Sequence, residues 1–184
     1  MIDVLPIIES RSHLIESVLN EFGHAIRLIK SLEDDLYAGT SEDRGSIGAH
    51  FRHNLDVGAN FLKGLETGTI DYGNRERDER VERSRLYAVQ RFERLICRMK
   101  ALPNETLETM VLVRSEVDPC VCHTSSVARE LEFLHSHTVH HHAMIAEKLR
   151  SLGVNVKADF GVAPSTLRFW AEQRTDFTAH TFQD

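Results

Sequence analysis

Four stretches of the chain carry apolar residues three or four positions apart, and this spacing constrains the fold more than any other feature. Apolar side chains at such intervals fall on one face of an α-helix. The predicted helices cover about residues 14–32, 46–66, 81–99 and 127–152. Four amphipathic helices bury their apolar faces most economically as an antiparallel four-helix bundle, so an all-α fold is predicted. The connections before the third and fourth helices are long enough for a crossover, which leaves the order of the helices open.

The segment from Thr106 to Ser126 breaks the helical pattern. β-Branched residues alternate on either side of the letters SEVDP, which predicts a short β-hairpin inserted before the last long helix. Residues 154–184 then form a C-terminal tail, in which Pro164 favours the start of a short helix. At 184 residues the chain is long enough to bury one core, and a single domain over residues 1–184 is expected.

The charge and hydropathy of the chain argue against nucleic-acid and membrane partners. The formal net charge is −6, whereas phosphate binding needs clustered Lys and Arg. In the Arg-rich run RERDERVERSR, acidic residues almost balance the basic ones, which favours a solvated loop and helix start. No apolar run approaches the roughly 20 residues that span a bilayer.

The cysteines and the N-terminal residues predict a cytoplasmic protein. Cys97, Cys120 and Cys122 are odd in number and do not suggest a disulfide framework. The first residues show neither the basic region nor the cleavage-like site of a signal peptide. The letters CVCH bring two thiols and an imidazole together, but no further ligands lie nearby in the sequence. A partly buried hairpin face therefore explains these two cysteines better than a soft-metal site.

Five of the eleven histidines fall within eight positions of the last predicted helix. His137 and His141 are four residues apart, so their imidazoles project from adjacent turns and can share one metal ion. His137 and His140 are the alternative pair, with one ring turned outward. On a helical wheel His141 lies near the centre of the apolar face and His137 toward one edge, while His135 and His142 lie toward the opposite edge.

Two histidines alone make a loose site, because a catalytic metal usually has three protein ligands and one open position. The second predicted helix offers His50 and His53, three residues apart. The wheel of that helix favours His50, which lies nearer its apolar face. The competing interpretation is a metal-free helical interaction module, in which the histidines are hydrogen-bonded core residues or solvated surface residues.

Two segments carry a resemblance to a known family. The letters SIGAHFRH in the second helix and SHTVHHHAMIA in the last resemble the DinB-like superfamily of metal-dependent enzymes. The resemblance implies a four-helix bundle with one histidine ligand on the second helix and an H-x-x-x-H pair on the last. It points to His53, His137 and His141 as ligands, with His140 as a neighbour that does not bind the metal. It therefore favours His53 over the wheel's choice of His50.

A narrower likeness covers most of the chain. The blocks GAHFRHNLD, DYGNRERD, RELEFLHSHTVHHHAMIA and DFGVAPST resemble, in that order, an uncharacterised DinB-like branch. Val57 departs from the pattern, because it stands where members of that branch often carry another histidine. The blocks are typical of the branch and do not indicate a particular reaction.

Three neutral imidazoles favour Zn²⁺ and also suit Ni²⁺, Fe²⁺ or Mn²⁺. A site with an open position lowers the pKa of bound water or binds a thiolate. The resemblance implies a transferase that uses a low-molecular-weight thiol, and a hydrolase is the second enzymatic interpretation. A non-catalytic metal-binding bundle that acts as an interaction protein is the alternative to both. Extensive apolar helix faces predict a homodimer in each case.

Further polar residues are candidates for supporting roles. Asp56, Asn60, Arg129 and Glu130 lie where they can orient an imidazole, and Glu130 can also act as a base. Their competing interpretation is ordinary surface polarity. Arg75 and Arg77 can grip an anionic small-molecule substrate, or simply tie their loop to Asp71 or Asp78.

Overall fold

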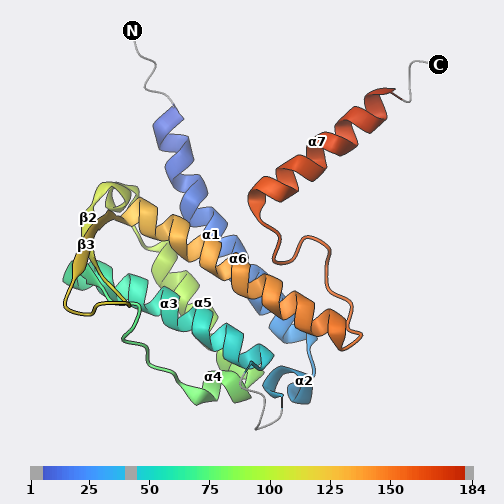
Figure 1. The fold of residues 1–184 in the computed structure, drawn as a ribbon, viewed down its shortest axis with the longest axis horizontal. Helices are drawn as coiled ribbons and strands as arrows, with labels where there is room; N and C mark the ends of the chain where they lie inside the picture. Colours follow the sequence, from blue (N-terminus) through green and yellow to red (C-terminus); the bar gives the residue numbers. More distant parts are fainter. Residues whose placement is uncertain (1–5, 40–44, 181–184) are drawn as a thin grey trace. The chain divides into compact units, whose positions relative to one another are not determined.

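The computed structural model describes residues 6–39 and 45–180, and helices dominate these segments (Figure 1). In chain order the elements are α1 (Pro6–Ser31), α2 (Asp34–Ala38), α3 (Ile47–Thr67), β1 (Thr69–Ile70), α4 (Glu79–Arg83), α5 (Arg85–Lys100), the 3₁₀ helix η1 (Asn104–Glu108), β2 (Met110–Arg114), β3 (Cys122–Ser126), α6 (Val127–Ser151) and α7 (Pro164–His180). The largely helical class predicted from the sequence is confirmed. The chain forms two compact units, Met1–Thr138 and Val139–Asp184, whose boundary falls within α6.

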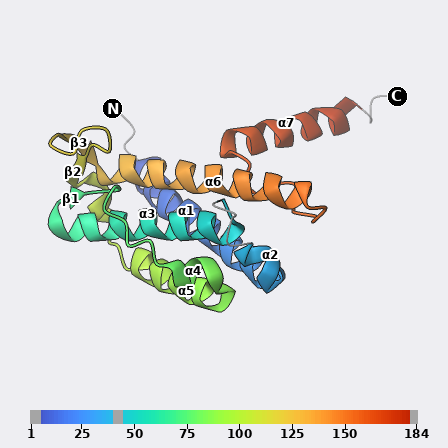
Figure 2. The same cartoon turned by 60° about the horizontal axis from the view of Figure 1, so that its bottom comes forward.

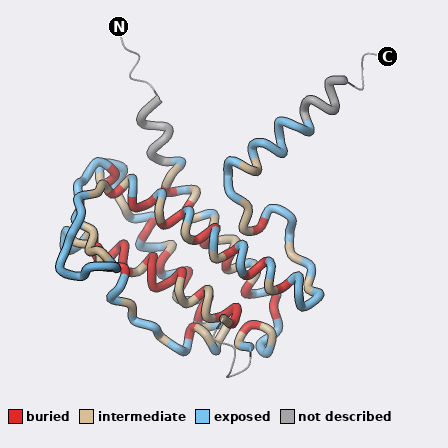
Figure 3. Tube along the Cα trace, viewed as in Figure 1, coloured by how far each residue is buried: buried red, intermediate tan, exposed pale blue. Residues whose placement is uncertain are grey.

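In the first unit, α5 packs against both α1 and α3, and α4 lies beside α3 and α5 (Figure 2). Phenylalanine rings join the long helices of this core. The ring of Phe92 lies 5.7 Å from Phe22 of α1 and 6.0 Å from Phe51 of α3, measured between centroids. All three side chains are fully buried, and each contributes roughly 1.5–3 kcal/mol through burial of its apolar surface. Buried and exposed residues alternate along these helices (Figure 3), as their apolar spacing predicts.

Three consecutive residues explain where α3 begins. The hydroxyl of Ser46 accepts a hydrogen bond from the amide of Ala49 at 3.0 Å, which caps the helix. Ile47 is fully buried. Gly48 lies against α4, where a Cβ would be 2.1 Å from the carbonyl oxygen of Glu82. A glycine here therefore allows the close approach of two backbones, and this approach fixes the helix that carries His53.

The first unit also contains a small three-stranded sheet. Strands β2 and β3 pair antiparallel, with Met110 opposite Ser126 and Arg114 opposite Cys122. The predicted hairpin before the last long helix is confirmed. Strand β1 adds a parallel pair to β2, with Thr69 beside Leu112. The sequence did not predict this strand, because two residues are too few to show a periodicity.

The third predicted helix is interrupted at Ser84. This residue has an extended backbone, ends α4, and caps α5 by accepting a hydrogen bond from the amide of Tyr87 at 3.3 Å. A serine hydroxyl offers the backbone an alternative partner, so it favours a helix start over a helix interior. The prediction of one continuous helix over 81–99 was therefore wrong at this residue.

In the second unit, the tail folds back on the C-terminal half of α6. The ring of Phe160 stacks on His142 at 4.6 Å between centroids. Gly161 adopts φ of 75°, and a Cβ there would lie 2.3 Å from the amide nitrogen of Ala143. Helix α7 then begins at Pro164, as predicted, and its 17 residues exceed the short helix expected from the sequence. Within the described ranges, no helix has the length and apolarity that a bilayer crossing requires.

Candidate metal centre

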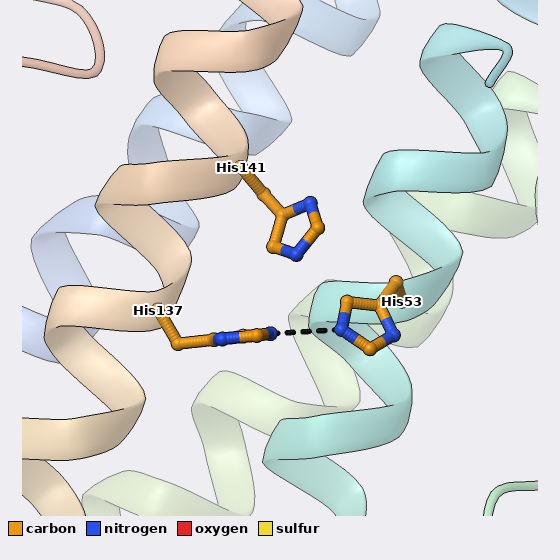
Figure 4. Close-up of side chains that lie close together, drawn as sticks. All are labelled: His53, His137 and His141. Carbon is orange, nitrogen blue, oxygen red and sulfur yellow. Dashed lines mark hydrogen bonds between the residues drawn. The ribbon is translucent and has the colours of Figure 1, made fainter.

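Three histidines converge at one point of the structure (Figure 4). His53 belongs to α3, whereas His137 and His141 lie one turn apart on α6. One ring nitrogen of each lies within 4.8 Å of the corresponding atoms of the other two. Among the residues that the structure describes, these three are the group of His, Cys, Asp and Glu side chains that can hold a metal. The alternates His50 and His140 are outside the group.

His53 of α3 and His137 of α6 are in direct contact. The Nε2 atoms of His53 and His137 are 2.8 Å apart, although 84 residues separate them in the chain. Ring nitrogens that share one tetrahedral ion at about 2.05 Å lie about 3.3 Å from each other. A shift of about half an ångström therefore converts this contact into a pair of ligands.

Arg75 determines the proton positions in the pair. Its Nη1 lies 2.8 Å from Nδ1 of His53. A guanidinium only donates, so Nδ1 accepts and the ring proton of neutral His53 is on Nε2. That proton is donated to Nε2 of His137, whose lone pair accepts it. The chemistry of Arg75 thus determines the tautomer of His53 and the direction of these two hydrogen bonds.

The protonation state of His53 suits a metal ligand. Burial, followed by the charges of His137 and Arg75, lowers the pKa of His53 to about 4. The ring is therefore neutral at physiological pH, as metal binding requires. Three neutral imidazole nitrogens fit a divalent transition metal. If His53 held a metal through Nε2, its ring proton would be on Nδ1 and would face the guanidinium donor of Arg75, which would favour displacement of Arg75.

The helical wheel of α6 predicted the burial of its histidines incorrectly. His142 and His135 are 0% and 8% exposed, whereas His141, predicted near the centre of the apolar face, is half-buried like His137. The reason is that Val139 and Ala146 are also buried. They extend the buried face toward His135 and His142 and leave His137 and His141 at its edge. His140 is exposed, as the wheel predicted.

Residues expected to orient an imidazole hold a loop instead. Asp56 accepts a hydrogen bond from the amide of Arg77 at 3.3 Å, and Asn60 donates to the carbonyl oxygen of Asn74 at 3.1 Å. Both lie on α3, so they fasten the loop of residues 71–78 along the helix that carries His53. Arg77 has φ of 53°, a left-handed conformation that is uncommon for arginine. This loop delivers Arg75 to His53.

Glu130 likewise has partners other than histidine. Its carboxylate accepts hydrogen bonds from the hydroxyls of Ser125 at 2.6 Å and Tyr72 at 3.0 Å. The expectation that Glu130 orients a ligand ring is therefore not met. Phe133, which the sequence did not single out, packs between these groups, with its ring 5.0 Å from Tyr72 and 5.4 Å from His137. Its position four residues before His137 was the available signal.

The hairpin cysteines are not part of the centre. Cys120 and Cys122 are free and exposed, as is Cys97. The partly buried face expected for the hairpin pair was wrong, because the outer positions of β3 face solvent. Within the described residues, the CVCH segment forms no group of three metal ligands.

Comparisons with known proteins add one partial similarity. No family model matches the chain, and no solved structure matches it. The chain is 30% identical over 108 residues to a protein described as FK506-binding protein 5 from Rhizopus delemar. The match covers 56% of this chain and 28% of that protein. The chain therefore spans little more than a quarter of the length of the relative.

Proposed function

We propose that the protein is a metal-dependent enzyme of the DinB-like four-helix-bundle type, with α1, α3, α5 and α6 as the bundle. The convergence of His53, His137 and His141 is the observation that carries the proposal. Two separate helices supply the nitrogens, and the ring of His53 is neutral, as metal binding requires. Zn²⁺ is the favoured ion, and Ni²⁺, Fe²⁺ or Mn²⁺ suit the same ligands.

The number of ligands favours catalysis over a purely structural role. Structural zinc sites are closed by four protein ligands, whereas three leave a position for water or substrate. When bound, the metal supplies Lewis acidity that lowers the pKa of a bound water or thiol. The residues of the chain that serve this chemistry are the three histidines, which bind, and Arg75, whose permanent positive charge attracts an anionic group of a small-molecule substrate. Transfer of a low-molecular-weight thiol is the proposed reaction, with hydrolysis as the second.

A non-catalytic metal-binding bundle that forms a homodimer is the alternative. Phe169 and Trp170 of α7 support it, because their side chains are 55% and 39% exposed. Large exposed aromatic side chains are typical of surfaces that meet a partner. In this alternative the metal joins two helices and substrate plays no part.

The test is elemental analysis of protein purified without a tag or added metal. The parent should contain close to one transition metal per chain, and His53→Ala, His137→Ala and His141→Ala should each lose most of it. His50→Ala and His140→Ala are matched controls that retain it, because neither belongs to the group. A parent without metal, or a variant pattern in which His50→Ala empties the site and His53→Ala does not, would contradict the proposal.

Substitution of Co²⁺ separates the enzyme from the structural alternative. An open position accepts an added thiol such as 2-mercaptoethanol, and a sulfur-to-cobalt charge-transfer band then appears in the near-ultraviolet. A closed site gives no such band. The absence of the band in cobalt-loaded protein would favour the non-catalytic alternative.

A further inference from the structure

A cavity of about 440 Å³ lies next to the histidine cluster, within the first unit. The end of the β2–β3 hairpin, the loop that carries Tyr72, and the first turns of α6 line it. Phe133 lines the cavity and also contacts His137, with 5.4 Å between the ring centroids. The cavity therefore adjoins the candidate metal centre but shares none of its three ligands.

A buried carboxylate forms one wall of this cavity. Glu130 is 7% exposed, and its two oxygens accept hydrogen bonds from Ser125 and Tyr72. Burial and the neighbouring charge of Glu130 raise the pKa of Tyr72 well above its usual value, so its hydroxyl remains a donor. In the described part of the chain, no Lys or Arg forms an ion pair with Glu130. A buried negative charge beside a cavity, without a cationic partner, favours a ligand that brings a positive charge.

The opposite charge also faces the cavity. Arg129 lines it and is exposed, and its positive charge acts on Tyr72. Within the described residues its guanidinium forms no ion pair, so it is available to a ligand. Arg114 also lines the cavity, but it is held by Asp71 at 3.1 Å and by the carbonyl oxygen of Pro119 at 2.6 Å. Of the two described arginines that line the cavity, Arg129 is therefore the one without an ion pair to a described residue.

We propose that this cavity binds a small molecule with an α-amino-acid group. Its ammonium pairs with Glu130, its carboxylate pairs with Arg129, and its apolar part contacts the rings of Tyr72 and Phe133. Adjacent opposite charges of the protein suit a zwitterion, because each charge of the ligand gains a charge-assisted hydrogen bond. That this ligand is the substrate of the histidine centre rests on the proposed function, whereas binding itself does not.

Three probes with the same ring and side chain test the proposal. L-Phenylalanine carries both charges, 2-phenylethylamine lacks the carboxylate, and 3-phenylpropionate lacks the ammonium. Calorimetric titration of the full chain, treated with EDTA to remove metal, should show phenylalanine binding about tenfold tighter than either analogue, since one charge-assisted hydrogen bond is worth roughly that factor. Equal affinities for the three probes, or no binding of phenylalanine, would overturn the proposal.

Two variants assign the charges. Glu130→Gln should remove the advantage of phenylalanine over 3-phenylpropionate, and Arg129→Gln should remove its advantage over 2-phenylethylamine. Glu132→Gln is the matched control, because Glu132 is exposed on the same helix and does not line the cavity. Arg129 is exposed, so its variant keeps the test valid if Glu130→Gln unfolds. Unchanged affinities in the Arg129 variant would contradict the assignment.

The failure of this proposal is distinguishable from the failure of the metal proposal. His141→Ala should empty the metal site and leave phenylalanine binding to metal-free protein unchanged, because His141 does not line the cavity. A parent protein without metal would refute the centre and leave the three affinities as expected. Loss of phenylalanine binding in His141→Ala would contradict a separate cavity.

Discussion

Helix α6 carries two pairs of histidines on different faces, and their surroundings differ. His135 and His142 are buried, and the ring of His142 stacks on Phe160. His137 and His141 are half-buried, and their ring nitrogens meet that of His53. The residue type is therefore the same on both faces, and the neighbours decide whether a histidine packs or is available to a ligand. We call His135 and His142 the packing face, and His137 and His141 the site face. Substitutions on the packing face should mainly lower stability, whereas substitutions on the site face should mainly lower metal content.

The largest effect on stability is expected on the packing face. His142→Ala should lower the free energy of unfolding by about 2–3 kcal/mol, because it leaves a cavity beside Phe160. His137→Ala should cost less than about 1 kcal/mol in metal-free protein, because its ring is half-buried. Urea unfolding in EDTA measures both. Equal losses in the two variants would show that the faces do not differ.

A smaller effect on stability is expected from pH, through the titration of His53. The pKa of His53 is about 4 in the folded protein, against 6.5 for an unperturbed histidine side chain, so between these values the unfolded chain binds a proton that the folded chain does not. The stability of metal-free protein should therefore fall as pH falls from about 6.5 to about 4. Because the ring is partly exposed, the contribution is discounted to roughly 1–2 kcal/mol.

The variant His53→Asn isolates this contribution, because asparagine does not titrate. The difference in unfolding free energy between parent and variant, measured by urea unfolding at several pH values, should change over this window. A difference that stays constant from pH 7 to pH 4 would contradict a depressed pKa at His53.

The smallest effect is expected in the affinity of the site for metal. Arg75→Gln should raise the affinity for Zn²⁺ by about five- to tenfold, because the amide oxygen of glutamine accepts a hydrogen bond from Nδ1–H of a ligating His53. Arg75→Lys is the control and should remain close to the parent, since lysine also only donates. Competition with a chromophoric chelator measures the affinities. A weaker affinity in Arg75→Gln would indicate that Arg75 supports the bound state.

The blocks that carry the family resemblance have identifiable structural roles. Ser46 caps α3, and Gly48 allows α4 to approach it. The DYGNRERD block forms the loop that α3 fastens through Asp56 and Asn60. Gly161 of the DFGVAPST block lies where a side chain would collide with α6. Backbone proximity and loop attachment thus explain these blocks without reference to a reaction, which is why they do not indicate one.

The sequence predicted the helices and the hairpin because their signals are local. Apolar spacing, capping residues and turn formers act within a few positions, so α3, α6 and the β2–β3 pair were expected close to their observed bounds. Helix α1 ends close to its predicted end but begins at Pro6, eight residues before its predicted start. The break at Ser84 and the parallel strand β1 were missed. The first depends on one hydroxyl that competes for the backbone, and the second depends on a partner 43 residues away, from Thr69 to Leu112.

By itself, the sequence determined that His137 and His141 share a helix face, because their spacing matches one turn. The wheel of the second helix favoured His50 over His53, which is the residue in the observed group, and the wheel of the last helix placed His141 at the centre of a face that in fact buries His142. Only the tertiary structure decided that His53 meets His137, that Arg75 occupies its second nitrogen, and that Glu130 faces a cavity rather than an imidazole. The physical reason is that a helical pattern describes one helix, whereas burial and hydrogen-bond partners depend on which segments fold against it.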